Sequence, residues 1–191
     1  MDLYEAIERR RTIRVFKEGA SEEQLRKIMA AGTKAPSAVN RQPWEFILVK
    51  DQKLIDQLAE IKFQQNKKDP PQRAKGNPAA AEKLAQVQKD SFRNASIIAV
   101  CHLVDWERSV WMCLENMSLA AVAEGLGSGI VMYWGEGQKE AGKALGLPEG
   151  YEVTAVLKIG VPGEEGFRRD KNPFAPRRPD FSWLHVNRFQ S

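Results

Sequence analysis

The middle of the chain contains the run VWMCLENMSLAAVAEG, which spans residues 110–125. Apolar side chains occupy most of its positions, and few charges interrupt them. On a helix of about 3.6 residues per turn they surround the axis on nearly every side, and Gly125 supplies a stop signal. A helix of this kind cannot keep a solvated face along its length. We therefore expect a helix over residues 105–125, placed at the centre of the core or in a subunit interface.

Extended segments flank this helix on both sides. Residues 96–104 are almost continuously apolar, as expected of a strand that is covered on both faces. Residues 129–133 form a short extended piece, residues 138–145 a short helix, and residues 151–161 a last strand. The helices are segregated around a few strands, with no repeated strand–helix–strand unit. The pattern therefore predicts the α+β class.

The N-terminal part carries start and stop signals for two helices. Asp2 can cap a first helix, and Ser21 with Gln24 forms a capping-box pattern before a second helix. Gly32 is the expected end of that second helix. Between the two helices, residues 12–16 alternate as a strand does.

Prolines and polar residues punctuate the next part of the chain. Two prolines mark residues 34–43 as a loop, and Trp44–Val49 after it is predicted to be a strand. Asp51 opens a helix that we expect to give way to a polar surface loop or lid over residues 64–78. Residues 79–93 then return to helical composition.

The length of 191 residues predicts one domain, since about 150 residues per domain is usual. We assign residues 1–165 to its main body. Beyond Pro162 the sequence becomes basic and rich in proline and aromatic residues, without helical or strand periodicity. Aromatic residues that form no core of their own must pack elsewhere. Residues 166–191 are therefore expected to form an arm of the same domain that packs on its own or a partner subunit, with disorder as the alternative.

The charge and the cysteine content limit the classes of protein to which the chain can belong. The net charge is +4, but bases and acids are interleaved, which is typical of a solvated surface and favours nucleic-acid binding only weakly. Cys101 and Cys113 lie in separate apolar runs, which predicts buried thiols in a reducing compartment. Neither a signal peptide nor a run of about 18 apolar residues is present. We expect a cytoplasmic protein without membrane contact.

Several kinds of active site are disfavoured by the residues available. His102 and His185 have no second ligand at metal spacing, so no metal site is expected. Residues 137–143 have phosphate-loop spacing, but Ala144 stands where a hydroxyl is needed. The glycines of residues 125–129 end a helix instead of following a strand, which is typical of a helix stop and not of a dinucleotide site.

Three sequence elements carry chemistry that local structure does not explain. They are Arg10, Arg11, Thr12 and Arg14 after the first helix, residues 35–44 before a strand, and Arg177 with Arg178 near the end. Guanidinium groups with a hydroxyl suit a phosphate monoester, which carries about −1.5 to −2 charges and three acceptor oxygens. Asn40 and Gln42 on a proline-stiffened loop offer donors and acceptors together, which suits the pyrimidine edge of a planar heterocycle.

Ordered motifs in the chain resemble those of the FMN-dependent nitroreductase family. The family's R-R-S-I-R-x-F motif resembles residues 10–16, with Thr12 keeping the hydroxyl of the usual serine. Its A-P-S-x-x-N-x-Q-P-W-x-F loop is similar to residues 35–46, matched at every named position. Its central helix, ending N-M-x-L-A-A-x-x-x-G-L-G-S, resembles residues 116–128, and its G-x-P segment resembles residues 160–162.

This resemblance implies an intertwined homodimer with a mainly antiparallel sheet surrounded by helices and with FMN at the subunit interface. Arg10, Arg11, Thr12 and Arg14 are expected at the phosphate end of the flavin, with Arg177 or Arg178 closing on it. Residues from the partner's loop are expected to approach the flavin ring: Pro36, Ser37, Ala38, Asn40 and Gln42. Backbone groups of Tyr133, Trp134 and Gly135 are expected to touch the ring, with Glu136 and Gly137 as alternatives.

The resemblance also implies an oxidoreductase, in which NADH or NADPH reduces the flavin and an acceptor such as a nitroaromatic or quinone then enters the same cleft. No dedicated catalytic side chain is expected, because the cofactor carries the chemistry. One alternative is a flavin enzyme with another reaction, namely dehalogenation or fragmentation of the flavin. A second alternative, from a different class, is a basic nucleic-acid-binding module.

Overall fold

The structure is a computed structural model that describes residues 1–163 and 183–189. Over these residues the helices are α1 (Leu3–Arg9), α2 (Glu22–Gly32), α3 (Gln52–Lys68), α4 (Pro78–Asp90), α5 (Glu107–Ala123) and α6 (Gly135–Ala144). The strands are β1 (Phe16–Gly19), β2 (Trp44–Val49), β3 (Ser96–Leu103), β4 (Gly127–Met132) and β5 (Tyr151–Pro162). Two 3-10 turns, Ala38–Asn40 and Gln72–Ala74, interrupt the connections.

The strands form one sheet in which every pairing between strands is antiparallel. Strand β5 is central, with β3 along one edge and β4 along the other, and β2 extends the sheet beyond β3. Gly160 of β5 pairs with both Gly127 of β4 and Gly19 of β1. Since a strand has two edges, β1 must lie on the β3 side of β5, beyond the end of β3. The predicted α+β class and mainly antiparallel sheet are confirmed.

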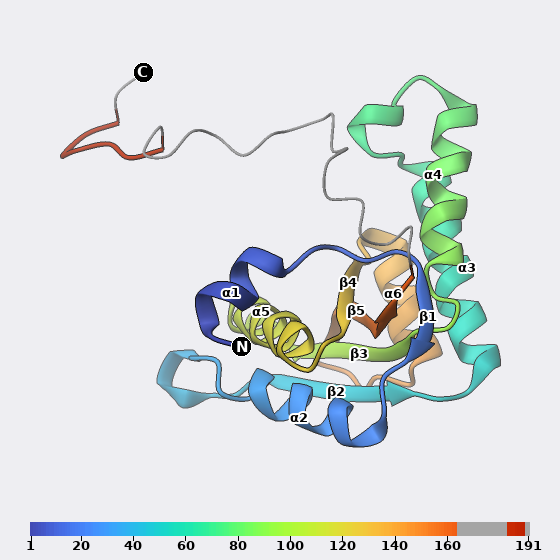
Figure 1. Cartoon of the computed structure of the whole chain (residues 1–191). Helices are drawn as coiled ribbons and strands as arrows, with labels where there is room; N and C mark the ends of the chain where they lie inside the picture. Colours follow the sequence, from blue (N-terminus) through green and yellow to red (C-terminus); the bar gives the residue numbers. More distant parts are fainter. Residues whose placement is uncertain (164–182, 190–191) are drawn as a thin grey trace.

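Helices cover both faces of this sheet (Figure 1). On one face, α2 and α5 pack against side chains that include Ile98, Val100 and Leu157. On the other face, α3 and α6 pack against side chains that include Ile97 and Val156. Successive residues of β3 point to opposite faces, which is why its apolar run is nearly continuous. Helix α4 lies along α3, and the two form an antiparallel pair that extends beyond the sheet (Figure 1).

Helix α5 occupies the central place predicted for it. It begins after Asp105, whose φ of 75° is left-handed, and Gly125 follows it with a φ of 76°. Leu114, like most of the inner face, is fully buried. The outer face of α5 is less enclosed in this single chain, because Met112 is 42% exposed and Glu115 is also exposed. The prediction of a core position holds for the inner face, and the outer face is available to a partner.

The predicted helix starts are confirmed by their capping contacts. The carboxylate of Asp2 accepts from the N–H of Glu5 at 2.9 Å. The Ser21 hydroxyl accepts from the Gln24 N–H at 3.3 Å, and the Gln24 side chain accepts from the Ser21 N–H at 3.0 Å. The strand predicted over residues 12–16 is wrong in extent. Only an isolated parallel bridge forms at Thr12, and regular pairing begins at Phe16.

The loop predicted over residues 64–78 is also wrong in part. Helix α3 continues to Lys68, so only residues 69–77 connect it to α4. Glutamine and lysine are good helix formers, and the polar composition reflects the exposure of this end of α3, not a loss of helix. Pro78 takes the first position of α4, where its missing N–H costs nothing, and the side chain of Asn77 caps the helix. Strand β4 and helix α6 begin earlier than predicted, at Gly127 and Gly135.

The predicted C-terminal arm lies mostly outside the described residues. Within residues 183–189, the rings of His185 and Phe189 stack with their centroids 4.2 Å apart. Trp183 and Phe189 are 52% and 83% exposed. The packing of the arm on its own or a partner subunit stays a prediction. Across the described part of the chain, no helix combines the length and apolar character needed to cross a membrane.

The N-terminal segment packs closely on the sheet at Gly129, and a substitution there tests this packing. A Cβ added at Gly129 would lie 2.4 Å from the carbonyl oxygen of Ile13 and 3.2 Å from Cε of Lys158. Because one of these neighbours is backbone, we expect Gly129→Ala to lower the free energy of unfolding by about 1–3 kcal/mol. Urea unfolding measures this change. Gly142→Ala in α6 is the matched control, since its nearest neighbour is 3.6 Å away, and an equal loss in both variants would contradict the argument.

Candidate functional site

The predicted phosphate-binding arginines begin at the C-terminal end of α1. Nη1 of Arg11 donates to the carbonyl oxygens of Glu8 and Arg10, both at 2.6 Å. Nε of Arg10 lies 3.6 Å from a carboxylate oxygen of Glu115 on α5. Cations at this position suit the negative end of the helix dipole. In the single chain, therefore, both guanidinium groups already have local partners, and that of Arg11 caps the helix.

The next residues of this segment run beside β4. Ile13 is 2% exposed, and its N–H donates to the carbonyl oxygen of Ser128 at 2.8 Å. Thr12 and Arg14, on either side of it, are exposed. Alternation along an extended backbone places these two side chains on the same side. The predicted hydroxyl and guanidinium are therefore presented together beside the edge of β4, with Ile13 as their anchor.

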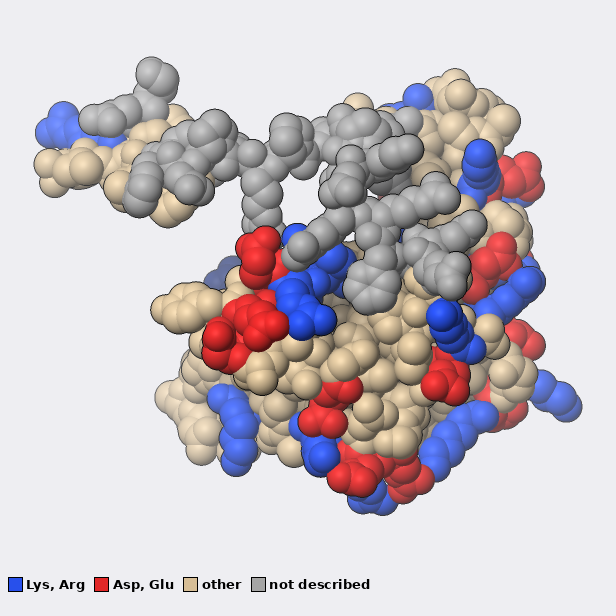
Figure 2. All heavy atoms as spheres, in the orientation of Figure 1, with Lys and Arg blue, Asp and Glu red and all other residues tan. Residues whose placement is uncertain are grey.

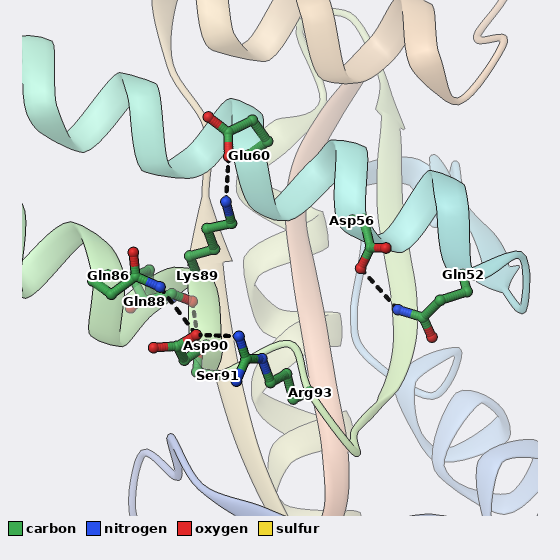
Figure 3. Close-up of polar contacts among 9 residues, drawn as sticks. All are labelled: Gln52, Asp56, Glu60, Gln86, Gln88, Lys89, Asp90, Ser91 and Arg93. Atoms are coloured by element: carbon green, nitrogen blue, oxygen red, sulfur yellow. Dashed lines mark hydrogen bonds and ion pairs between the residues drawn. The ribbon is translucent and has the colours of Figure 1, made fainter.

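Lys158, which the sequence interpretation missed, lies close to this segment. It stands in the middle of β5 and is 1% exposed, the largest of the fully buried side chains in the described part of the chain. Its Nζ donates to the hydroxyl of Ser91. That hydroxyl donates to the carbonyl oxygen of Gln88 at 2.6 Å (Figure 3). A lone lysine inside the otherwise apolar run of residues 155–161 is the sequence signal that could have identified it.

The described surroundings of Lys158 disfavour the charged form of its amine. Burial, together with the nearby Arg14 guanidinium, lowers the pKa of Lys158 to about 7. Within the described residues, no carboxylate is among the causes of this shift. Two adjacent cations form a set of donors that suits an anionic group. The residues present therefore fit a cofactor that carries a phosphate, such as FMN.

The loop predicted to face the flavin ring is held in a strained conformation. Val39, Asn40 and Gln42 all have left-handed φ angles, of 49°, 54° and 49°. This is costly for Val39, because its branched Cβ is disfavoured there, and the side chain is 89% exposed. The Ser37 hydroxyl accepts from the N–H of Gln42 at 2.9 Å and braces the turn. Strain of this kind is typical of functional loops.

Other side chains of the same loop are displayed outward. Pro36, Ala38 and Asn40 are exposed, and Ser37 is half-buried. The Nε2 of Gln42 donates to the carbonyl oxygen of Asn40 at 3.4 Å, so the predicted amide pair lies together. The loop thus presents its polar groups to the exterior of this chain instead of to its own core.

The segment after β4 is fixed onto α3. The Tyr133 hydroxyl donates to the carbonyl oxygen of Leu58 at 2.9 Å, and the Trp134 ring N–H donates to Asp69 at 3.0 Å. The Nζ of Lys62 lies 3.8 Å from the centroid of the Trp134 ring and donates to the carbonyl oxygen of Met132 at 2.8 Å. The side chains of Tyr133 and Trp134 are therefore held by contacts with α3 and its C-cap.

The backbone that follows is less constrained by side chains. No side-chain hydrogen bond caps the start of α6 at Trp134. Gly135 has a φ of 56°, which glycine adopts without strain. Backbone groups near Gly135, and not the Tyr133 or Trp134 side chains, are therefore the parts of this segment suited to contact a ligand.

The single chain does not bring all predicted site residues together. Trp44, just after the loop, pairs with His102, which pairs with Glu152 of β5. Ser128, beside Thr12, pairs instead with Ile159. Seven residues along β5 correspond to about 23 Å, and the three spacings from β2 to β4 add about 14 Å across the sheet. The loop of residues 36–42 thus lies far from residues 10–14 of its own chain, and residues 133–135 follow the end of β4 opposite to Ser128. Arg177 and Arg178 lie outside the described residues.

A separate hollow of about 400 Å³ lies between α3 and the end of α4. Each of its charged side chains has a partner (Figure 3): Asp56 accepts from the Gln52 side chain at 2.8 Å, and the other four form two ion pairs. Lys89 contacts Glu60 at 2.5 Å, and Arg93 contacts Asp90 at 3.1 Å. This hollow contains none of the predicted site residues. Because its charged groups have partners within the chain, they do not point to a bound ligand.

Comparison with known proteins identifies the family. The sequence model of the nitroreductase family matches residues 7–161. The chain belongs to the nitroreductase family. A protein of Archaeoglobus fulgidus, named provisionally as an NADH dehydrogenase/NAD(P)H nitroreductase, is 31% identical over 88% of this chain and 91% of its own length. An iodotyrosine deiodinase of Thermotoga neapolitana is 28% identical over 94% of this chain and 98% of its own length.

Solved structures show that the nitroreductase fold is shared. An FMN-dependent nitroreductase from Clostridium difficile has a TM-score of 0.70 at 23% identity, over 96% of this chain and 98% of that one. An iodotyrosine deiodinase bound to FMN and 3-iodo-L-tyrosine has a TM-score of 0.73 at 24% identity, over 100% of both chains. At these identities the likeness concerns the fold.

The predicted family, fold class and enzyme class are confirmed. As a member of the nitroreductase family, the chain is an oxidoreductase. The predicted buried thiols are also confirmed, since Cys101 and Cys113 are free and buried, and burial raises the pKa of each to about 12. The roles of the individual site residues stay predictions.

The titration of Lys158 should make the free energy of unfolding depend on pH. Its pKa is about 7 in the folded chain, whereas an unfolded lysine titrates near 10.4. Between these pKa values the unfolded state binds more protons than the folded state, so this group makes the free energy of unfolding rise with pH. Below about pH 7 the amine is charged in both states, and the full cost of burying the charge lowers the stability of the folded chain. Lys158→Met should therefore be more stable than the wild type at pH 6, with the difference shrinking towards pH 10 by up to about 1.4 kcal/mol per pH unit.

Urea unfolding of the cofactor-free protein at several pH values measures this difference. Lys53→Met, at an exposed lysine, is the matched control and should show little difference at any pH. A stability difference for Lys158→Met that does not change between pH 6 and pH 10 would show that the amine does not titrate in this range.

Proposed function

We propose that this chain is an FMN-dependent oxidoreductase that passes electrons from NADH or NADPH to an acceptor such as a nitroaromatic or a quinone. The bound FMN supplies the redox chemistry. The observation that carries the proposal is the placement of two cations beside β4: the amine of Lys158, which is buried, and the Arg14 guanidinium, which lies near enough to lower the pKa of that amine. The names of the family relatives, which include NAD(P)H nitroreductases, support the same class of reaction.

The residues of the chain divide into three groups around the proposed cofactor. Arg10, Arg11, Thr12 and Arg14 would hold the phosphate end. Pro36, Ser37, Ala38, Asn40 and Gln42 would face the flavin ring. The backbone of Tyr133, Trp134 and Gly135 would contact the ring from the end of β4. None of these side chains needs to act as an acid or base, because their work is to bind and orient.

The separation of these groups supports a homodimer with shared sites. Residues 36–42 lie too far from residues 10–14 of the same chain to grip one small ligand directly, so a second copy would have to supply one of the two segments. An apolar surface is available for the contact, since Leu3, Tyr4 and Ile7 of α1 are 61%, 83% and 49% exposed. Helix α1 packs beside α5, whose Met112 is also exposed. Exposed apolar side chains gathered on neighbouring helices favour a protein interface.

A second candidate function is reductive dehalogenation. The Thermotoga neapolitana relative, an iodotyrosine deiodinase, aligns over nearly the whole chain. Fold alone does not separate the two reactions, because one fold hosts several chemistries. Nucleic-acid binding is not proposed, since both signs of charge are interspersed on the face shown in Figure 2.

Purification and assay distinguish these functions. The protein should bind about one FMN per chain, and NADH or NADPH should bleach the flavin spectrum. Reoxidation by a nitroaromatic without halide release from 3-iodotyrosine supports the first function. Halide release from 3-iodotyrosine in the presence of a reductant supports the second. A protein that binds no flavin would contradict both.

Arg14 is the side chain whose loss should weaken FMN binding most clearly. Removing one partner of a close charged contact costs about 2–5 kcal/mol. We expect Arg14→Ala to weaken FMN binding by that amount, measured by fluorescence titration of the cofactor-free protein. Arg26→Ala on α2 removes a surface arginine paired with Glu22 and should leave the affinity unchanged. Equal affinity of the Arg14→Ala variant and the wild type would remove Arg14 from the site.

Shared sites can be tested with a mixed dimer of two differently tagged variants. One protomer carries Arg14→Ala and the other Asn40→Ala. If each site takes Arg14 from one chain and Asn40 from the other, one site receives both defects and the second receives neither. About half of the normal FMN binding and activity should then return. If each site is made by one chain, both sites of the mixed dimer stay damaged, and no recovery above the two single-variant dimers would contradict the shared site.

A further inference from the structure

Lys158 carries an amine into the interior of the sheet, where a charged group is costly. Its strand, β5, is paired on both sides at this point, with Ile97 of β3 and Gly129 of β4. The amine extends past Gly129, where an added Cβ would lie 3.5 Å from Nζ and 2.4 Å from the Ile13 carbonyl oxygen. The lysine therefore passes beside the backbone that immediately precedes Arg14. Gly129 provides the room for this arrangement.

The described groups that surround the amine are a hydroxyl, an aromatic ring, uncharged strand residues and one cation. Strand β3 offers Ile97 and strand β4 offers Gly129, neither of which carries charge. The end of α4 offers the Ser91 hydroxyl and the Phe92 ring, whose centroid is 5.6 Å from Nζ. The N-terminal segment offers Arg14, which is a second cation. Ser91 and the ring can orient the amine, but neither supplies a negative charge.

A buried amine in these surroundings holds its proton weakly. Burial disfavours the charged form, and the Arg14 guanidinium adds repulsion, so that the pKa of Lys158 falls to about 7. A negative charge bound beside Arg14 and within about 4–6 Å of the amine would oppose both effects, because an opposite charge at that range favours the protonated amine. The charge on Lys158 should then depend on what is bound beside Arg14.

We propose that Lys158 is a positioning residue of the cofactor site that is largely neutral in the cofactor-free protein above neutral pH and takes up a proton when FMN places a negative charge beside Arg14. The inference rests on the proposed function, since it needs FMN at that segment. Two parts of FMN can supply the charge: the phosphate, which is charged on binding, and the ring, which gains charge when it is reduced. The proton comes from solvent and forms the third N–H bond of the ammonium group at Nζ.

Calorimetry of FMN binding tests the first source of charge. Titrations at pH 8 in buffers of different ionisation enthalpy report the number of protons taken up per FMN bound. At pH 8 the phosphate is already fully ionised, since its second pKa is about 6, and so it does not contribute. If the phosphate lies near Lys158, the wild type should take up a large fraction of one proton and Lys158→Met none. The uptake by the wild type should shrink at pH 6, where the amine already carries its proton.

The midpoint potential of bound FMN tests the second source of charge. Dithionite supplies two electrons, and each proton taken up with them changes the potential by about 30 mV per pH unit, because a tenfold change in a two-electron equilibrium is 29.6 mV. If the reduced ring lies near Lys158, the wild type should show a slope between pH 7.5 and 9 that is steeper by one proton than that of Lys158→Met. Lys53→Met, at the exposed lysine, should match the wild type in both experiments.

A direct measurement on the wild type keeps the inference testable if Lys158→Met folds poorly. Carbon-13 resonances of lysine Cε, recorded against pH, should show one amine that titrates near neutrality without cofactor and at a higher pH with oxidised or reduced FMN bound. Tight FMN binding with equal proton uptake, equal potential slopes and unchanged lysine titration would overturn this inference alone. Failure of the wild type to bind FMN would overturn it together with the proposed function.

Discussion

The burial of β5 on both faces and both edges is the constraint on which the rest of the structure depends. Its backbone groups must all be paired inside the protein, so β3, β4 and β1 are held in fixed register beside it. Its side chains alternate between the two cores, which require α5 on one face and α3 with α6 on the other. Every segment proposed to bind the cofactor is positioned by an element attached to this strand or to its neighbours.

Two residues that depart from stable folding rules lie in or beside segments that we propose bind the cofactor. Lys158 places a buried amine in the central strand, and Val39 holds a branched side chain at a left-handed φ of 49°. Each departure costs stability, and the apolar cores around β5 offset that cost. Such exceptions are expected where a protein binds a ligand, since local consistency is otherwise the rule.

The same scaffold leaves the acceptor open. Relatives named as nitroreductase and as iodotyrosine deiodinase align with the chain over most of its length, and both kinds share its fold. The redox chemistry belongs to the proposed cofactor, and the protein contributes binding, orientation and charge. In the proposed dimer, the acceptor would be decided by the side chains that line the space above the flavin, to which both protomers would contribute.

The sequence by itself determined the features that depend on near neighbours. The caps at Asp2 and Ser21, the strand Trp44–Val49 and the stop at Gly125 are set by residues within a few positions, so their patterns could be recognised directly. The ordered motifs of residues 10–16 and 35–46 likewise identified the family. The continuation of α3 through residues 64–68 was missed because a polar helix end and a polar loop share the same composition.

Only the tertiary structure decided how distant segments meet. Lys158 contacts Ser91, which is far from it in the sequence, and neither residue suggests the other. The guanidinium of Arg11 caps α1, and Tyr133 bonds to α3, although their motifs fit direct contact with a ligand equally well. Strand order places β2 and β4 on opposite sides of β5 and so separates two segments that one flavin is expected to need. These relations depend on strand pairing and burial between distant parts of the chain, which local patterns do not encode.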